Sequence, residues 1–278
     1  MDGTFNRSAD RGEQNILLYV DNHLLYTATQ QNWHAIASDR SDSTQPVKQL
    51  HAALSDYTFS HAPSAGSERH EPLQRRFEVM ARTTPCAPAV SFNGRCLNYG
   101  DLDEQADALA LHLQAAGLAP CSFCVVDLAP SLAQVRAILA VLKAGAACLQ
   151  VDARIGAGAL AAVLAALAPA FCLTRHAGHA SAAAALHTVC CDEDAADLPY
   201  GWPDELPVGA RTPACAHATL TPQGDLCIVV RTHRALNELL GRAPPARSEP
   251  GPGPDPGRLW RPLSSGAPLT IGAPAVSG

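Results

Sequence analysis

Short apolar runs alternate with longer helical patterns from position 123 to position 174, and this alternation constrains the fold more than any other feature. The runs have the length and composition of buried strands, and the segments between them have helical length. A strand, helix, strand order of this kind needs right-handed crossovers, which place the strands parallel in one sheet. The strands are expected at Phe123–Leu128, Ala147–Val151 and Ala170–Thr174, and the helices at Ser131–Lys143 and Ala159–Ala168.

A helix and a hairpin are predicted before this core. Leu73, Phe77 and Met80 follow an i, i+4, i+7 spacing that gives a helix one apolar face. Asn93-Gly94 is the dipeptide favoured in two-residue hairpin turns. The hairpin strands are expected at Ala89–Phe92 and Arg95–Tyr99, and a helix opened by Asp101 and Asp103 at Leu102–Ala116, ended by Gly117.

The rest of the chain carries weaker patterns. Residues 1–15 are polar, Ser60–Glu71 has the composition of a linker, and Ala243–Gly257 is more than half proline and glycine. Asp192–Gly224 is interpreted as loop. The remaining elements are strands at Ile16–Val20, Thr188–Cys191, Leu226–Val230 and Leu269–Ile271, and helical segments at Ala28–Ser38 (capped by Thr27), Val47–Leu54 and His233–Leu240.

Composition excludes several classes of function. A net charge of −6 without a basic cluster argues against nucleic-acid binding. No window is long and apolar enough to span a bilayer, and the N-terminus lacks the order of a signal peptide, so no membrane association and a cytoplasmic location are expected. The ten cysteines are then reduced, and those in apolar runs are interpreted as small hydrophobes.

Several segments resemble the adenylation domains of non-ribosomal peptide synthetases, the amino-acid-activating, AMP-forming family. LNYGDLDEQADALALHLQAAGL (Leu97–Leu118) is similar to the family's first core motif, and LKAGAACLQVD (Leu142–Asp152) to its second. THRALNELL (Thr232–Leu240) resembles the helix that follows the family's phosphate loop. Further similarity lies at Leu73–Arg95 (the opening helix and turn), Leu259–Gly278 (a later helix and strand) and residues 16–58 (the tail of a condensation domain).

The resemblance implies a fold, a division of the chain and partners. The fold is α/β, a partial N-terminal lobe of an adenylate-forming enzyme with helices layered on a mainly parallel sheet. The domains are residues 1–71 (condensation-domain tail and linker), 72–240 (truncated lobe) and 241–278 (Pro/Gly-rich linker and residual strand). The family uses ATP and Mg²⁺ and passes the aminoacyl group to a carrier-bound phosphopantetheine. No cofactor is expected for this chain, and the implied partners are condensation and carrier domains.

The phosphate loop departs most from the family. The family loop, TSGSTGxPKG, aligns without a gap to Thr219–Ile228, TLTPQGDLCI, where only Thr219 and Gly224 match and Cys227 replaces the lysine. No catalytic, cofactor-binding or metal-binding residue is therefore carried over, and no His-His pair of a condensation domain is present. The surviving motif positions are interpreted as structural: Leu97, Tyr99, Leu102, Leu142, Lys143, Gly145 and Asp152.

Other constellations have a structural interpretation that we favour. Gly156–Ala161 matches the dinucleotide pattern G-x-G-x-x-[GA] but has no acidic residue about 20 positions on. Arg231 is taken as a surface arginine rather than an anion ligand at the next helix. The others are a zinc-like set (His176, His179, His187, Cys190, Cys191), a redox-like pair entering a strand (Cys121, Cys124), and Ser264-Ser265-Gly266, which lacks the glycine of a nucleophile elbow.

Three functions remain open from the sequence. The favoured one is a degenerate adenylation-domain segment, catalytically silent alone, which is either a decayed gene product or a scaffold or docking module between synthetase domains. The others are an active adenylating ligase completed by another chain, and an unrelated small α/β nucleotide-binding protein. A half-lobe with open sheet edges is also expected to be a marginal or aggregation-prone monomer.

Overall fold

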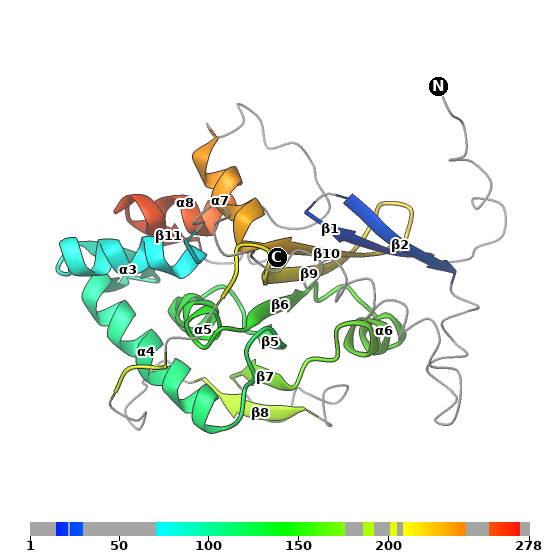
Figure 1. Ribbon diagram of the computed structural model, residues 1–278, viewed down its shortest axis with the longest axis horizontal. Helices are drawn as coiled ribbons and strands as arrows, with labels where there is room; N and C mark the ends of the chain where they lie inside the picture. The colour runs from blue at the N-terminus through cyan, green and yellow to red at the C-terminus, as the bar shows by residue number, and fades with distance from the viewer. Residues whose placement is uncertain are drawn as a thin grey trace.

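The computed structural model describes residues 15–21, 23–29, 71–175, 186–191, 201–204, 208–242 and 256–272 (Figure 1). Within these ranges, eight strands form one sheet in the order β2-β1-β10-β9-β6-β5-β7-β8, and three form a small sheet in the order β11-β3-β4. The strands of the large sheet are β1 (Asn15–Val20), β2 (His23–Thr29), β5 (Phe123–Asp127), β6 (Ala147–Val151), β7 (Phe171–Thr174), β8 (His187–Cys190), β9 (Pro213–Leu220) and β10 (Leu226–Thr232).

The centre of the large sheet confirms the parallel arrangement expected from the alternating pattern. Strand β5 pairs in parallel with β6 and β7, β6 with β9, and β7 with β8. Only β1–β2 and β9–β10 are antiparallel pairs within the described part of this sheet. The fold is therefore α/β with a mainly parallel sheet.

Helices cover both faces of the large sheet (Figure 1). The α6 helix packs on one face together with the apolar side chains of β1. The other described helices belong to the core on the opposite face, which also takes in the small sheet. The helices are α3 (Leu73–Thr83), α4 (Tyr99–Ala115), α5 (Leu132–Lys143), α6 (Ala157–Leu167), α7 (His233–Gly241) and α8 (Gly257–Ser265), and the small sheet is β3 (Pro88–Phe92), β4 (Arg95–Asn98) and β11 (Leu269–Ile271).

The predicted hairpin forms, and the helix after it starts earlier than expected. Asn93 (φ 49°) and Gly94 (φ 78°) both have positive φ, as a two-residue turn of the primed type requires. Asn98 caps α4, because its side chain accepts a hydrogen bond of 2.7 Å from the backbone N–H of Asp101. The helix therefore begins at Tyr99, and Asp101 lies in its first turn rather than at its start.

Two predictions of secondary structure are wrong. The segment Asp192–Gly224, interpreted as loop, contains β9. This strand has no β-branched run, and pairing with both β6 and β10 determines its conformation rather than local propensity. Thr27 lies within β2 and does not cap a helix, since β2 is paired with β1 up to Thr29.

Several other predictions lie wholly or partly outside the described residues. The helix expected over Ala28–Ser38 has only its first two residues in the described part, where they belong to β2. The helical turn at Val47–Leu54 and positions 60–70 and 243–255 of the two predicted linkers lie outside. Gly257, the last residue of the second linker, begins α8.

The N-terminal strands are part of the large sheet. Strand β1 runs parallel to β10, with Ile16 opposite Leu226 and Val20 opposite Val230. It buries Ile16, Leu18 and Val20 on the face that α6 covers. Strands β1 and β2 therefore share a sheet with the lobe that was expected to begin at residue 72. In the described residues, no helix is long and apolar enough to cross a membrane.

Candidate functional site

The position of the family's phosphate loop is occupied by a tight β-hairpin. Strands β9 and β10 are antiparallel, with Leu220 opposite Leu226 and Thr219 opposite Cys227. Five of the ten aligned residues thus lie in strands, and only Thr221–Asp225 form the connection. A connection this short is closed by its own hydrogen bonds, so it differs from an open phosphate-binding loop.

The backbone N–H groups of this turn are used within it. The Thr221 N–H donates to the Asp225 carbonyl (2.8 Å), and the Gly224 N–H donates to the Thr221 carbonyl (2.9 Å). The Asp225 N–H donates to the Thr221 hydroxyl (3.1 Å), and Pro222 has no N–H. A phosphate cradle needs several free N–H groups pointing at the anion. At most one turn N–H, that of Gln223, is left for a ligand.

Charge around the hairpin is also unsuited to phosphate. The Asp225 carboxylate accepts hydrogen bonds from both the backbone and the side-chain nitrogen of Asn15 (2.9 and 3.1 Å). At the end of β6, Asp152 binds Arg154 through contacts of 2.6–3.1 Å and accepts from the Thr219 hydroxyl (3.2 Å). Hydrogen bonding from Arg154 holds the pKa of Asp152 well below its usual range. The two carboxylates repel phosphate, and the nearby arginine is neutralised.

The N-terminus of α7, the next possible anion site, is likewise filled by protein groups. The first three N–H groups of the helix donate to the Thr212 carbonyl (3.1 Å), the Ala210 carbonyl (2.7 Å) and the hydroxyl of the cap residue Thr232 (3.2 Å). Thr232 in turn donates its own N–H and hydroxyl to Asp21 (2.8 and 2.7 Å). A helix N-terminus binds anions through such N–H groups, and here none of the first three is left over.

Arg231 and His217 line a separate cavity of about 200 Å³ under α8. Arg231 is half-buried near the end of β10, so it is less exposed than the surface arginine that was expected. The Nδ1 atom of His217 is buried and has no hydrogen-bond partner among the described residues. Burial lowers the pKa of His217 to about 4, so the ring is neutral at pH 7. Sequence reasoning missed His217 because it lies in the strand that was interpreted as loop.

The surviving motif positions lie in the core or at turns. Tyr99, Leu102 and Leu142 are almost fully buried, and Gly145 has a φ of 77° that favours glycine. The Tyr99 hydroxyl lies within donating distance of the carbonyls of Pro262 (3.2 Å) and Ala267 (3.1 Å), which connects α4 to the end of α8. Leu97, at the end of β4, packs partly buried against the same core.

The other sequence candidates do not come together as sites in the described residues. Cys121 lies on an exposed turn, Cys124 is buried in β5, and burial raises the pKa of both thiols, which opposes thiolate chemistry. Gly156 caps α6 after β6, as the dinucleotide pattern requires, but the Asp152–Arg154 pair lies just before it.

The zinc-like set and the serines of Ser264-Ser265-Gly266 also do not form a site in the described residues. His187 and Cys190 are exposed in β8, Cys191 is buried, and His176 and His179 lie outside the described residues. No group of three or more metal-ligating side chains is found in the described ranges. Ser264 and Ser265 donate their hydroxyls to carbonyls of the last turn of α8.

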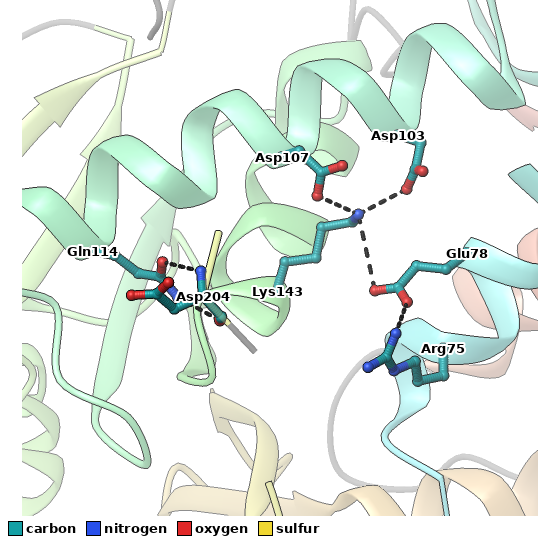
Figure 2. Close-up of polar contacts among 7 residues, drawn as sticks. All are labelled: Arg75, Glu78, Asp103, Asp107, Gln114, Lys143 and Asp204. Carbon is teal, nitrogen blue, oxygen red and sulfur yellow. Dashed lines mark hydrogen bonds and ion pairs between the residues drawn. The ribbon is translucent and has the colours of Figure 1, made fainter. Parts of the chain in front are cut away.

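A buried charge cluster at the end of α5 was not a candidate from the sequence (Figure 2). The Lys143 ammonium, whose side chain is 4% exposed, lies 2.7 Å from Asp103, 2.5 Å from Asp107 and 3.9 Å from Glu78. Asp103 and Asp107 come from one face of α4, and Glu78 comes from α3. Burial lowers the pKa of Lys143, but the two aspartates more than offset this, and the pKa is raised. The signal was the i, i+4 spacing of the two aspartates on a helix packed against α5.

Comparisons with known proteins find one matching family and several similar proteins. The family described as AMP-binding enzyme matches residues 77–229. Surfactin synthase subunit 3 of Bacillus subtilis is 36% identical over 138 residues, which is 50% of this chain and 10% of that protein. The dimodular nonribosomal peptide synthase of the same organism is 38% identical over 105 residues, 38% of this chain and 4% of that protein. The chain thus spans a tenth or less of the length of these relatives.

Solved structures show the same fold. The N-terminal subdomain of NpsA from Klebsiella oxytoca has a TM-score of 0.63 and 24% identity, over 75% of this chain and 56% of that one. An artificially fused adenylation–PCP di-domain, NpsA-ThdA from Klebsiella oxytoca, has a TM-score of 0.65 and 22% identity, over 76% of this chain and 44% of that one.

Proposed function

Because the chain belongs to the AMP-binding enzyme family, as a segment of a non-ribosomal peptide synthetase adenylation domain, we propose that it is a structural lobe that does not activate an amino acid on its own. The observation that carries this is the closed hairpin at Thr221–Asp225. Three of its five residues have their N–H groups bonded within the turn, and Pro222 has no N–H. Activation of an amino acid by ATP needs groups that neutralise the triphosphate, and this position offers a carboxylate instead.

The N-terminal strands support a scaffold role. Asn15 binds the hairpin through Asp225, and Asp21 binds the start of α7 through Thr232, so β1 is held at both ends of β10. We propose that residues 1–71, the predicted condensation-domain tail and linker, attach to the lobe through this strand. The lobe would then extend over 72–240, with 241–278 as linker and residual strand, and its partners would be condensation and carrier domains of a synthetase.

Amino-acid-dependent exchange of pyrophosphate into ATP tests the proposed function. The purified chain is expected to show no exchange above background with any of the common amino acids, because the hairpin provides neither a cation nor a set of free N–H groups for the phosphates. An intact adenylation domain assayed in parallel is the positive control. Exchange that depends on one amino acid and saturates with its concentration would show that the chain is an active ligase.

A further inference from the structure

A cavity of about 540 Å³ lies beside the Lys143 cluster. It is bounded by α3, α4, the end of α5 and the segment Trp202–Asp204. Asp204 is fastened to α4, because its N–H donates to the Gln114 side chain (2.9 Å) and its carbonyl accepts from the same side chain (3.1 Å; Figure 2). The segment Trp202–Asp204 is therefore held against α4, the helix whose aspartates contact Lys143.

Among the described residues that line the cavity, acidic side chains outnumber basic ones by one. Four carry a carboxylate (Glu78, Asp103, Asp107 and Asp204) and three are cationic (Arg75, Arg82 and Lys143). Two of the cations already form ion pairs with the lining carboxylates. Lys143 contacts Asp103 and Asp107, and Arg75 contacts Glu78 at 3.0 Å. The cavity is therefore anionic in balance, which favours a cationic ligand.

A buried hydrogen-bond acceptor in the same cavity has no donor. Gln74 lines the cavity and is 7% exposed, and its side-chain oxygen has no hydrogen-bond partner in the described residues. An unsatisfied buried acceptor of this kind costs about 1–3 kcal/mol. A ligand that brings N–H groups into the cavity would remove this cost, so the preferred cation is one that also donates hydrogen bonds.

An exposed indole stands at the cavity wall. Trp202 is 85% exposed, the highest exposure among the large hydrophobic side chains of the described residues. Aromatic faces attract ammonium and guanidinium groups, and tryptophan is enriched among the residues that contribute most to binding. An inorganic cation does not account for this feature, and no set of metal-ligating side chains is present in the described ranges.

We propose that this cavity is a binding site for an organic cation, a primary ammonium or guanidinium group on a short carbon chain. The cation is placed between the carboxylates and Trp202, and its N–H groups donate to Gln74. This site is distinct from the hairpin, so the inference does not rest on the proposed function.

Calorimetric titration of the full chain with agmatine, at low salt, tests the site. Agmatine carries both a guanidinium and an ammonium group. We expect saturable binding that weakens about fivefold in Trp202→Ala and in Gln74→Leu, a change typical of losing one cation–π contact or hydrogen bond. The matched controls are Leu24→Ala, another exposed apolar side chain, and Gln223→Leu, an exposed glutamine of the hairpin turn; both are expected to bind as the unmodified chain does.

A second titration separates the two sources of the cation. A blocked pentapeptide with one central arginine binds as tightly as agmatine if the cation is a partner's side chain, and more weakly if it is a free small molecule; either result supports the site. No heat with either probe, or binding that is unchanged in both Trp202→Ala and Gln74→Leu, overturns it. Trp202 is exposed, so its replacement leaves a folded chain for the measurement.

Discussion

Replacing Lys143 with methionine is expected to lower the free energy of unfolding by about 3–5 kcal/mol. The Lys143 ammonium is buried against Asp103 and Asp107, and methionine keeps most of the side-chain volume while removing the charge. The loss comes from the two aspartates, which stay desolvated without a counter-charge. Urea unfolding followed by far-UV circular dichroism, at pH 7, measures the change.

The control for this prediction removes the aspartate charges as well. Lys143→Met combined with Asp103→Asn and Asp107→Asn is expected to recover most of the lost stability, because no unpaired charge is left in the cluster. A buried ion pair is often replaceable in this way at little cost. If Lys143→Met alone changes the unfolding free energy by less than about 1 kcal/mol, the cluster is not desolvated as the structure shows.

Mild acid is expected to destabilise the fold through His233. His233 is 1% exposed, its Nδ1 accepts the backbone N–H of Leu73 (3.0 Å), and burial lowers its pKa to about 4. The folded pKa lies below the unfolded value of about 6.5, so the unfolded chain binds the proton first and stability falls as pH drops from about 6.5 to about 4. The expected loss between pH 7 and pH 5 is about 2 kcal/mol from this residue.

Two variants separate His233 from His217, a partly exposed histidine whose Nδ1 atom is buried. His233→Asn keeps an acceptor for the Leu73 N–H but cannot be protonated, so the pH-dependent loss should shrink by about 2 kcal/mol. His217→Leu should shrink it by a similar amount, because burial also lowers the pKa of His217 to about 4. Unfolding free energies of both variants and of the unmodified chain, measured from pH 7 to pH 5, test both predictions. An unchanged pH profile in His233→Asn would mean that His233 is accessible to solvent protons in the folded chain.

Sequence patterns identified the elements whose local signals agree with their surroundings. Asn93-Gly94 specified the hairpin, and the strand between Ala147 and Val151 has the predicted bounds. The strand β9 was missed because Pro213–Leu220 is alanine-rich and gains its conformation from partners on both sides. The place of β1 in the lobe's sheet also escaped prediction, because its partner β10 lies more than 200 positions away along the chain.

More of the hairpin than of the Lys143 cluster could be predicted from the sequence. An ungapped alignment was enough to show that the phosphate-loop lysine and glycines are replaced. It could not show that the N–H groups of Thr221, Gly224 and Asp225 are already bonded, since that depends on the closure of the β9–β10 ladder. The Lys143 cluster depends on the packing of three helices, and the two motifs that contain Lys143 and the aspartates do not reveal that packing.

Amide chemical shifts of the hairpin, recorded with and without saturating ATP and Mg²⁺, test the central claim most directly. The claim is that the N–H groups at the phosphate-loop position are committed to the turn. It predicts that the amide resonances of Thr221, Gly224 and Asp225 do not move when the nucleotide is added. A saturable shift of these three resonances with ATP, absent with Mg²⁺ alone, would show that the turn opens to bind phosphate and would contradict the claim.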